Sequence, residues 1–142
     1  MSMTTEELLA LSEARGYIEV PAELAGLDAA SVLLPSGRCA WSVSERGING
    51  AEYRGRLGHE MGHCETGAFY TRFSAPSARG KCEELAERWQ IRNMLPRSAL
   101  RAAMRQGART SWELAEFFDL PEPLILRAVA YYRLRRRVKP GK

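Results

Sequence analysis

Three glycines inside one predicted helix constrain the packing of this chain more than any other feature of the sequence. Asn49 is a typical helix N-cap residue, so a helix is expected over residues 50–65. Within it, Gly55, Gly58 and Gly62 are spaced by three and four residues and therefore lie on one side. A glycine inside a helix costs about 1 kcal/mol relative to alanine. Three of them indicate that another backbone or a bound group comes very close to this side.

The segments around this helix predict a fold that contains both helices and strands. Two β-prone runs, residues 31–34 and 39–43, flank the turn residues 35–37 and predict a hairpin within a small antiparallel sheet. Apolar periodicity and cap residues predict further helices near residues 5–14, 79–94, 96–106, 112–118 and 122–135. The last residues, "RRRVKPGK", predict a frayed tail.

Length and composition favour one cytoplasmic domain over residues 1–142. The hydrophobic share of 45% and the charged share of 27% are those of a soluble globular protein. No apolar run approaches the roughly 18 residues of a membrane span, and the first residues carry acids where a signal peptide carries bases. The odd cysteine count, Cys39, Cys64 and Cys82 with no C-x-x-C pair, predicts reduced thiols rather than a disulfide framework.

The glycine-bearing helix also carries both histidines of the chain in the pattern H-E-x-x-H. Residues four apart on a helix face the same way, so His59 and His63 can direct both imidazoles at one metal ion. Glu60 lies beside His59 and can reach a water that the metal holds. Zinc lowers the pKa of such a water, and the glutamate can take its proton as the hydroxide attacks a carbonyl. The pattern predicts metal-assisted hydrolysis with Glu60 as general base; the alternative is a chance pair of surface histidines.

A catalytic zinc site needs a third protein ligand and one open position. No third histidine exists, so this ligand must be a carboxylate or a thiolate, and the next long helix offers Cys82, Glu83, Glu84 and Glu87. Glu83 and Glu87 share a face, so one can bind the metal while the other accepts the free ring N–H of a ligand histidine. Glu84 is turned about a third of a circle away, and cysteine-rich shells are more often structural. We predict Glu83 as the ligand and Glu87 as the outer partner.

Two residues near the motif have less specific expectations. Tyr70, in the predicted loop after the histidine helix, could donate a hydrogen bond to an oxyanion. The alternative is an aromatic side chain packed beside Phe69 and Phe73. Cys64 follows His63 but points off the metal face, so a thiol of the core or the surface is expected.

Two stretches form a pair, "GHEMGH" and, about twenty residues later, "EELAERWQIRNMLP". The pair resembles the ImmA/IrrE family of metallopeptidases, whose members look like H-E-x-G-H followed by E-x-x-A-x-x-F-A-x-x-L-L-M-P. Glu83 and Ala86 match the second motif, Trp89 takes its aromatic place, and "MLP" closes it. The resemblance covers about residues 30–135. Two features depart from it: Gln90-Ile91 replaces a small pair, and Glu87 stands where Asn or Asp is usual.

The resemblance implies a zincin-like α+β fold. A small antiparallel sheet would pack on the H-E-x-x-H helix and on a second ligand helix, within a catalytic core of residues 1–96. It also implies Zn²⁺ held by His59, His63 and Glu83, with Glu60 as general base. Family members typically cleave or otherwise relieve a repressor protein. The implied partner is therefore a protein substrate, a helix-turn-helix repressor encoded nearby.

The basic character of the chain lies in its last third. Residues 97–142 hold 11 Lys and Arg against 4 Asp and Glu, a surplus of +7, whereas residues 1–96 hold 10 against 13. Here "LAEFFDLPEPLILRAV" resembles a helix-turn-helix. Pro123 in the first turn of its second helix, and few polar side chains before Arg127, count against base contacts. DNA contact is open but not favoured, and these helices could equally pack on the core or bind an acidic partner.

Two functions from different classes therefore stand. The first is a zinc endopeptidase that cleaves a specific regulatory protein. The second is a DNA- or partner-binding transcriptional regulator whose zinc site is vestigial or structural. Both predict bound zinc, so a requirement for Glu60 separates them.

Overall fold

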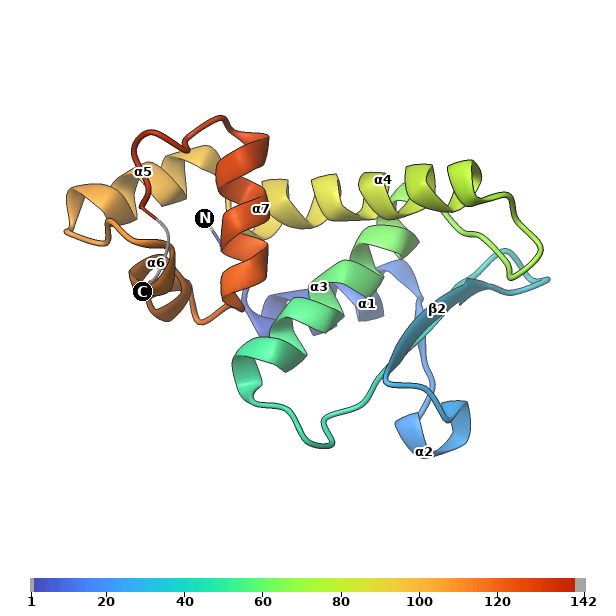
Figure 1. Ribbon diagram of the computed structural model, residues 1–142. Coiled ribbons are helices and arrows are strands. Elements are labelled where there is room, and N and C mark those ends of the chain that lie inside the picture. Colours follow the sequence, from blue (N-terminus) through green and yellow to red (C-terminus); the bar gives the residue numbers. More distant parts are fainter. Residues whose placement is uncertain (1, 140–142) are drawn as a thin grey trace.

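The computed structural model describes residues 2–139 and shows an α+β fold (Figure 1). Helices dominate, and three short strands form a sheet near one end of the molecule. The order of the elements is α1 (Thr5–Arg15), β1 (Ile18–Glu19), α2 (Ala22–Ala25), β2 (Ala29–Leu33), β3 (Cys39–Val43), α3 (Gly50–Thr66), α4 (Pro76–Met94), α5 (Arg97–Arg105), α6 (Ser111–Phe118) and α7 (Glu122–Tyr131).

The sheet confirms the predicted hairpin but is mixed rather than purely antiparallel. Strands β2 and β3 pair antiparallel, with Ser31 opposite Trp41, and β1 pairs parallel to β3 on its other side. The parallel partner escaped prediction because its two residues are too few to form a periodic pattern. All residues of β3 are buried because it is the central strand of the sheet. Strand β2 is an edge strand of the same sheet.

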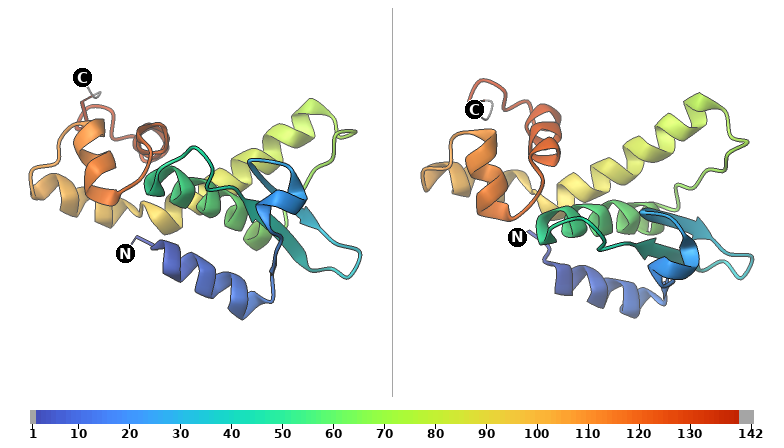
Figure 2. Two further views of the ribbon diagram at one scale, coloured as in Figure 1. Left: turned by 90° about the horizontal axis from the view of Figure 1, so that it is seen from below. Right: turned by 60° about the horizontal axis from the view of Figure 1, so that its bottom comes forward.

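Helix α3 packs against elements from both the helical part and the sheet. Figure 2 shows it between α1 and α4, and it also contacts β2 and β3. It begins where the Asn49 side chain accepts the backbone N–H of Glu52, and it ends at Gly67, whose φ of 67° is left-handed. The expected close approach is confirmed: a Cβ on Gly62 would lie 2.5 Å from the backbone oxygen of Ala86 in α4.

Gln90 is a buried polar residue in the contact between α4 and α3. Its side chain is only 2% exposed, and its Nε2 donates to the Gly55 carbonyl oxygen of α3 at 2.6 Å. Gly58 leaves room for this amide, because a Cβ at position 58 would lie only 3.0 Å from the same nitrogen. The buried polar group is therefore satisfied by the glycine side of α3.

The C-terminal region differs from expectation at its end. Helix α7 stops at Tyr131 instead of residue 135, and the following segment to residue 139 is not frayed. Leu134 and Val138 are buried, and the Lys139 backbone pairs with Thr110 and with the Ser111 N–H at 2.8 Å. The run of arginines masked these two apolar anchors in the sequence. Residues 140–142 of the predicted tail lie outside the described residues.

One cluster of buried hydrophobic residues extends from Leu8 to Val138 and so joins the N-terminal and C-terminal parts. Arg54 of α3 also links the N-terminal and C-terminal parts, because its guanidinium donates to the carbonyls of Met3 and Phe118. Burial lowers the pKa of Arg54 below its ordinary value, and these carbonyls satisfy the desolvated donors. Within residues 2–139, no helix is both long and apolar enough to cross a membrane.

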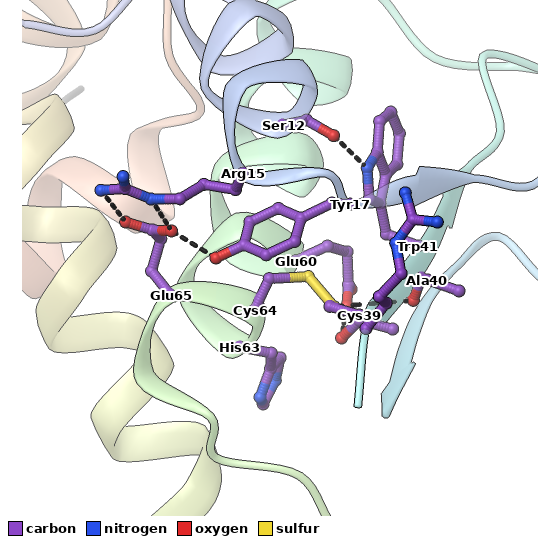
Figure 3. The surroundings of a disulfide bond; sticks show 12 residues. Ser12, Arg15, Tyr17, Cys39, Ala40, Trp41, Glu60, His63, Cys64 and Glu65 are labelled. Carbon is purple, nitrogen blue, oxygen red and sulfur yellow. Dashed lines mark hydrogen bonds and ion pairs between the residues drawn. A yellow bond between two sulfur atoms is a disulfide. The ribbon is translucent and has the colours of Figure 1, made fainter. Parts of the chain in front are cut away.

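The prediction of three reduced thiols is wrong for two of them. Cys39 of β3 and Cys64 of α3 form a disulfide with a Cα–Cα distance of 5.6 Å (Figure 3). The two cysteines are 25 residues apart, and only the packing of α3 on the sheet brings them together. Cys82 is the free cysteine among the described residues. Cytoplasmic localisation stays a prediction, and the disulfide counts against it because such bonds persist mainly in oxidising compartments.

Candidate metal centre

Three side chains from two helices converge at the crossing of α3 and α4. Glu83 places one oxygen 3.1 Å from Nε2 of His59 and the other 2.7 Å from Nε2 of His63. One ligand atom from each residue lies within 4.8 Å of the others. Helix geometry aligns the two histidines, and the close contact at Gly62 holds α4 near enough for Glu83 to reach them. These three residues could hold a metal ion.

His63 is oriented for this role by a backbone group. Its Nδ1 lies 2.6 Å from the carbonyl oxygen of Ala68, just beyond the end of α3. A carbonyl only accepts, so Nδ1 donates in this bond, and Nε2 is the ring nitrogen left to meet a metal ion. Nε2 is also the atom that faces Glu83. The side chain of His63 is 7% exposed, whereas that of His59 is 28% exposed, so the site is open on the His59 side.

Glu60 is buried next to the three candidate ligands and has its own partner. The hydroxyl of Ser31 on β2 donates to Oε1 of Glu60 at 2.7 Å. Glu60 is not one of the three converging ligands, but it lines the same pocket of about 390 Å³ as His59, His63 and Glu83. One carboxylate oxygen is thus fixed by the sheet, and the carboxylate borders the space beside the ligands.

The other candidates on α4 have different partners. The thiol of Cys82 donates to the Phe69 carbonyl oxygen at 3.4 Å, and Glu84 forms an ion pair with Arg88. Glu87, predicted to hold a ligand histidine, instead pairs with Arg127 of α7 at 3.0 Å. The structure therefore brings only Glu83 of this group onto the histidines. A candidate ligand histidine was expected to donate its second ring N–H to Glu87. For His63, the carbonyl of Ala68 takes this place.

Tyr70 lies at the rim of the site. Its ring meets that of His63 edge-on, with 6.2 Å between centroids, and lines the same pocket as Glu60. Partial burial, and then the charge of Glu83 and a hydrogen bond to it, raise the pKa of Tyr70 above its ordinary value. The phenol therefore keeps its proton and remains a hydrogen-bond donor at neutral pH.

Two hollows border the candidate ligands and share part of their lining. The first is bordered by β2 and by Phe69 and Tyr70. The second, of about 450 Å³, is bordered by Arg56 and by residues of α7. Both include His59, Glu60 and Glu83, so one hollow lies on the edge-strand side of the candidate ligands and the other on the α7 side. A substrate bound in either hollow would lie beside the candidate ligands.

Sequence reasoning missed two groups that support the site. Ser31 is 29 residues from Glu60, and no local pattern links a strand hydroxyl to a helix carboxylate over that separation. The Ala68 carbonyl is a backbone group, so no residue type in the sequence marks it. Its position just after the helix end at Gly67 could have been used to predict that it lies near His63. Both act on residues that the sequence had already singled out.

The second helix of the helix-turn-helix resemblance is α7, and it packs on α4. Its apolar stripe, including Ile125, is buried. Arg127, the side chain of this helix that could contact a base, forms the ion pair with Glu87. This helix offers little to a base edge.

Comparison of the chain with protein-family models, with curated proteins and with solved structures found no match in any of the three.

Proposed function

We propose that the protein is a zinc-dependent endopeptidase with a zincin-like core. The observation that carries the proposal is the burial of Glu60 in the pocket that the three candidate ligands line. Two imidazoles and a carboxylate form the ligand set of one class of catalytic zinc sites, which keeps a fourth position open. Bound zinc supplies Lewis acidity toward water and toward a substrate carbonyl.

The residues of the chain divide the remaining work. Glu60, held by Ser31, would take a proton from the attacking water and pass it to the leaving amine. Tyr70, still protonated at neutral pH, would donate to the oxygen on which charge develops. Ala68 keeps Nε2 of His63 free to act as a ligand.

A polypeptide substrate is favoured by the edge strand beside the site. Within residues 2–139, strand β2 has a partner only on its β3 side, and Ala29, Ala30 and Ser31 of this strand line the pocket. An edge strand can pair its backbone with an extended peptide, which would lay a scissile bond over the ligands. The partner proposed from the family resemblance is a repressor-type regulatory protein encoded nearby, which would present an extended segment to this edge strand.

The proposal is tested by cleavage of two substrates under the same conditions. The zinc-loaded protein is incubated with the helix-turn-helix regulator encoded beside it and with a proteome-derived peptide library, and products are read by mass spectrometry. Glu60→Gln should lose at least about 100-fold in rate while keeping its zinc, because it removes only the proton acceptor. Glu84→Gln, which alters an exposed carboxylate on α4, is the matched control and should cleave like the wild type.

Two results would contradict the proposal. One is the absence of any cleaved peptide from either substrate with zinc bound. The other is full activity in Glu60→Gln. Either would leave a regulator with a structural or vestigial zinc site as the better reading.

A further inference from the structure

Six cationic side chains line one groove in the C-terminal part of the chain, apart from the candidate metal centre. The groove has a volume of about 800 Å³ and shares no lining residue with the pockets at the candidate ligands. It is lined by Arg101, Met104, Arg105, Arg109, Arg136, Arg137 and Lys139. Among the described residues that line it, Met104 alone has no positive charge.

These cations come from three segments that the fold fixes relative to one another. Arg101 and Arg105 stand four residues apart on α5 and so share a face. Arg109 is anchored because its Nε donates to the Met104 carbonyl at 3.1 Å. The segment after α7 returns past α5 toward α6 (Figure 1) and is held there by the Lys139 backbone bonds to Arg109 and Ser111.

The cations of the groove have no ion-pair partner among the described residues. Bringing six positive charges together costs free energy through mutual repulsion, and an anionic partner would relieve that cost. The arrangement is therefore suited to a ligand with several negative charges.

We propose that this groove binds the phosphate backbone of duplex DNA without reading its sequence. Arginine forks match phosphate oxygens, and six cations spread over three segments exceed what a single phosphate can neutralise. A protein partner is less suited, because protein interfaces centre on apolar or aromatic anchors and the groove offers only the nearly buried Met104. No aromatic side chain of the described residues lines the groove, so single-strand binding by base stacking is disfavoured.

The assignment differs from the helix-turn-helix resemblance and does not depend on the peptidase proposal. The helix-turn-helix would place α7 on DNA, but α7 packs on α4. The cationic groove instead uses α5 and the segment that the sequence had marked as a frayed tail. Glu60→Gln should bind DNA like the wild type, so failure of one proposal leaves the other standing.

The test is fluorescence anisotropy with a labelled 20-base-pair duplex of arbitrary sequence, measured between 50 and 200 mM salt. Wild-type affinity should fall by about 10³-fold over this range if all six cations meet phosphates. Arg105→Gln/Arg137→Gln should bind at least about tenfold more weakly at 50 mM salt and lower the salt slope by about two. Both side chains are exposed, so an unchanged melting temperature should accompany the loss.

The matched control is Arg46→Gln/Arg72→Gln, which removes two exposed arginines outside the groove and changes the net charge equally. It should retain affinity within about twofold. The proposal is overturned if the wild type does not bind duplex at 50 mM salt, or if both double variants lose affinity equally. Tighter binding of poly-glutamate than of duplex at equal charge would also overturn it, in favour of an acidic protein partner.

Discussion

Glu83 is the residue whose role depends most on which face of α4 it occupies. Its two oxygens face Nε2 of His59 and of His63, whereas the adjacent Glu84 points to Arg88 on the exposed side. Adjacent helix positions differ by about 100° in direction, so the two carboxylates cannot exchange roles. The pair therefore offers a test of the ligand set in which charge and helix are matched.

We expect Glu83→Gln to lower zinc affinity by more than about 100-fold, and Glu84→Gln to leave it unchanged. Loss of an outer partner already costs 10–100-fold, and here a direct ligand is removed. Competition with a chromophoric chelator measures the affinity. Equal affinity in the two variants would remove Glu83 from the site, and unaltered zinc content in His63→Ala would remove the site altogether.

At the scale of elements, the contact between α3 and α4 positions the candidate ligands. Gly62 allows the Ala86 backbone to approach, and Ala86 lies one turn after Glu83 on α4. A side chain at position 62 would meet a backbone carbonyl, which cannot swing aside as a flexible side chain can. The spacing of the two helices therefore sets the distance from Glu83 to the histidines.

Gly62→Ala should destabilise the fold by about 1–2 kcal/mol and weaken zinc binding. The cost of overpacking, about 1–3 kcal/mol, is partly offset by the better helix propensity of alanine. Gly80→Ala is the control: position 80 lies in the same helix pair with open space around it, so this variant should be stabilised by up to about 1 kcal/mol. Urea unfolding gives both values, and a stabilised Gly62→Ala would refute the close approach.

At the scale of the whole molecule, the Cys39–Cys64 disulfide links β3 to α3 at the residue that follows the candidate ligand His63. Figure 3 shows it close to Tyr17 and Glu65, whose side chains hydrogen-bond to each other. A cross-link limits the conformations of the unfolded chain, and by the chain-entropy estimate a loop of this length contributes about 3 kcal/mol.

Reductant should therefore lower the urea midpoint of the wild type by an amount equivalent to about 3 kcal/mol. It should not affect Cys39→Ala/Cys64→Ala, which begins at the reduced stability or below it, and Cys82→Ala should respond like the wild type. Thiol titration of the unfolded, unreduced protein should find one free thiol, that of Cys82. Three free thiols in that titration would show that the bond is not formed.

The sequence predicted what depends on neighbours along the chain. Caps and glycines located α3, turn residues located the β2–β3 hairpin, and the four-residue spacing placed His59 and His63 on one face. Prediction from the sequence failed where the local residue pattern is too short or is obscured by neighbouring charged residues. The two residues of β1 are too few to show a period, and the arginines before Val138 hid an anchored segment.

By itself, the sequence determined the histidine helix, the position of Glu60 beside His59 and a short set of candidates for a third metal ligand. Only the tertiary structure decided that Glu83 faces the histidines, that Ser31 holds Glu60, that Cys39 meets Cys64, and that six cations share a groove. The physical reason is the range of the interactions. Helix direction and capping are set within a few residues, whereas these four arrangements join segments that meet only when α3 packs on the sheet and on α4, or when the tail returns to α5.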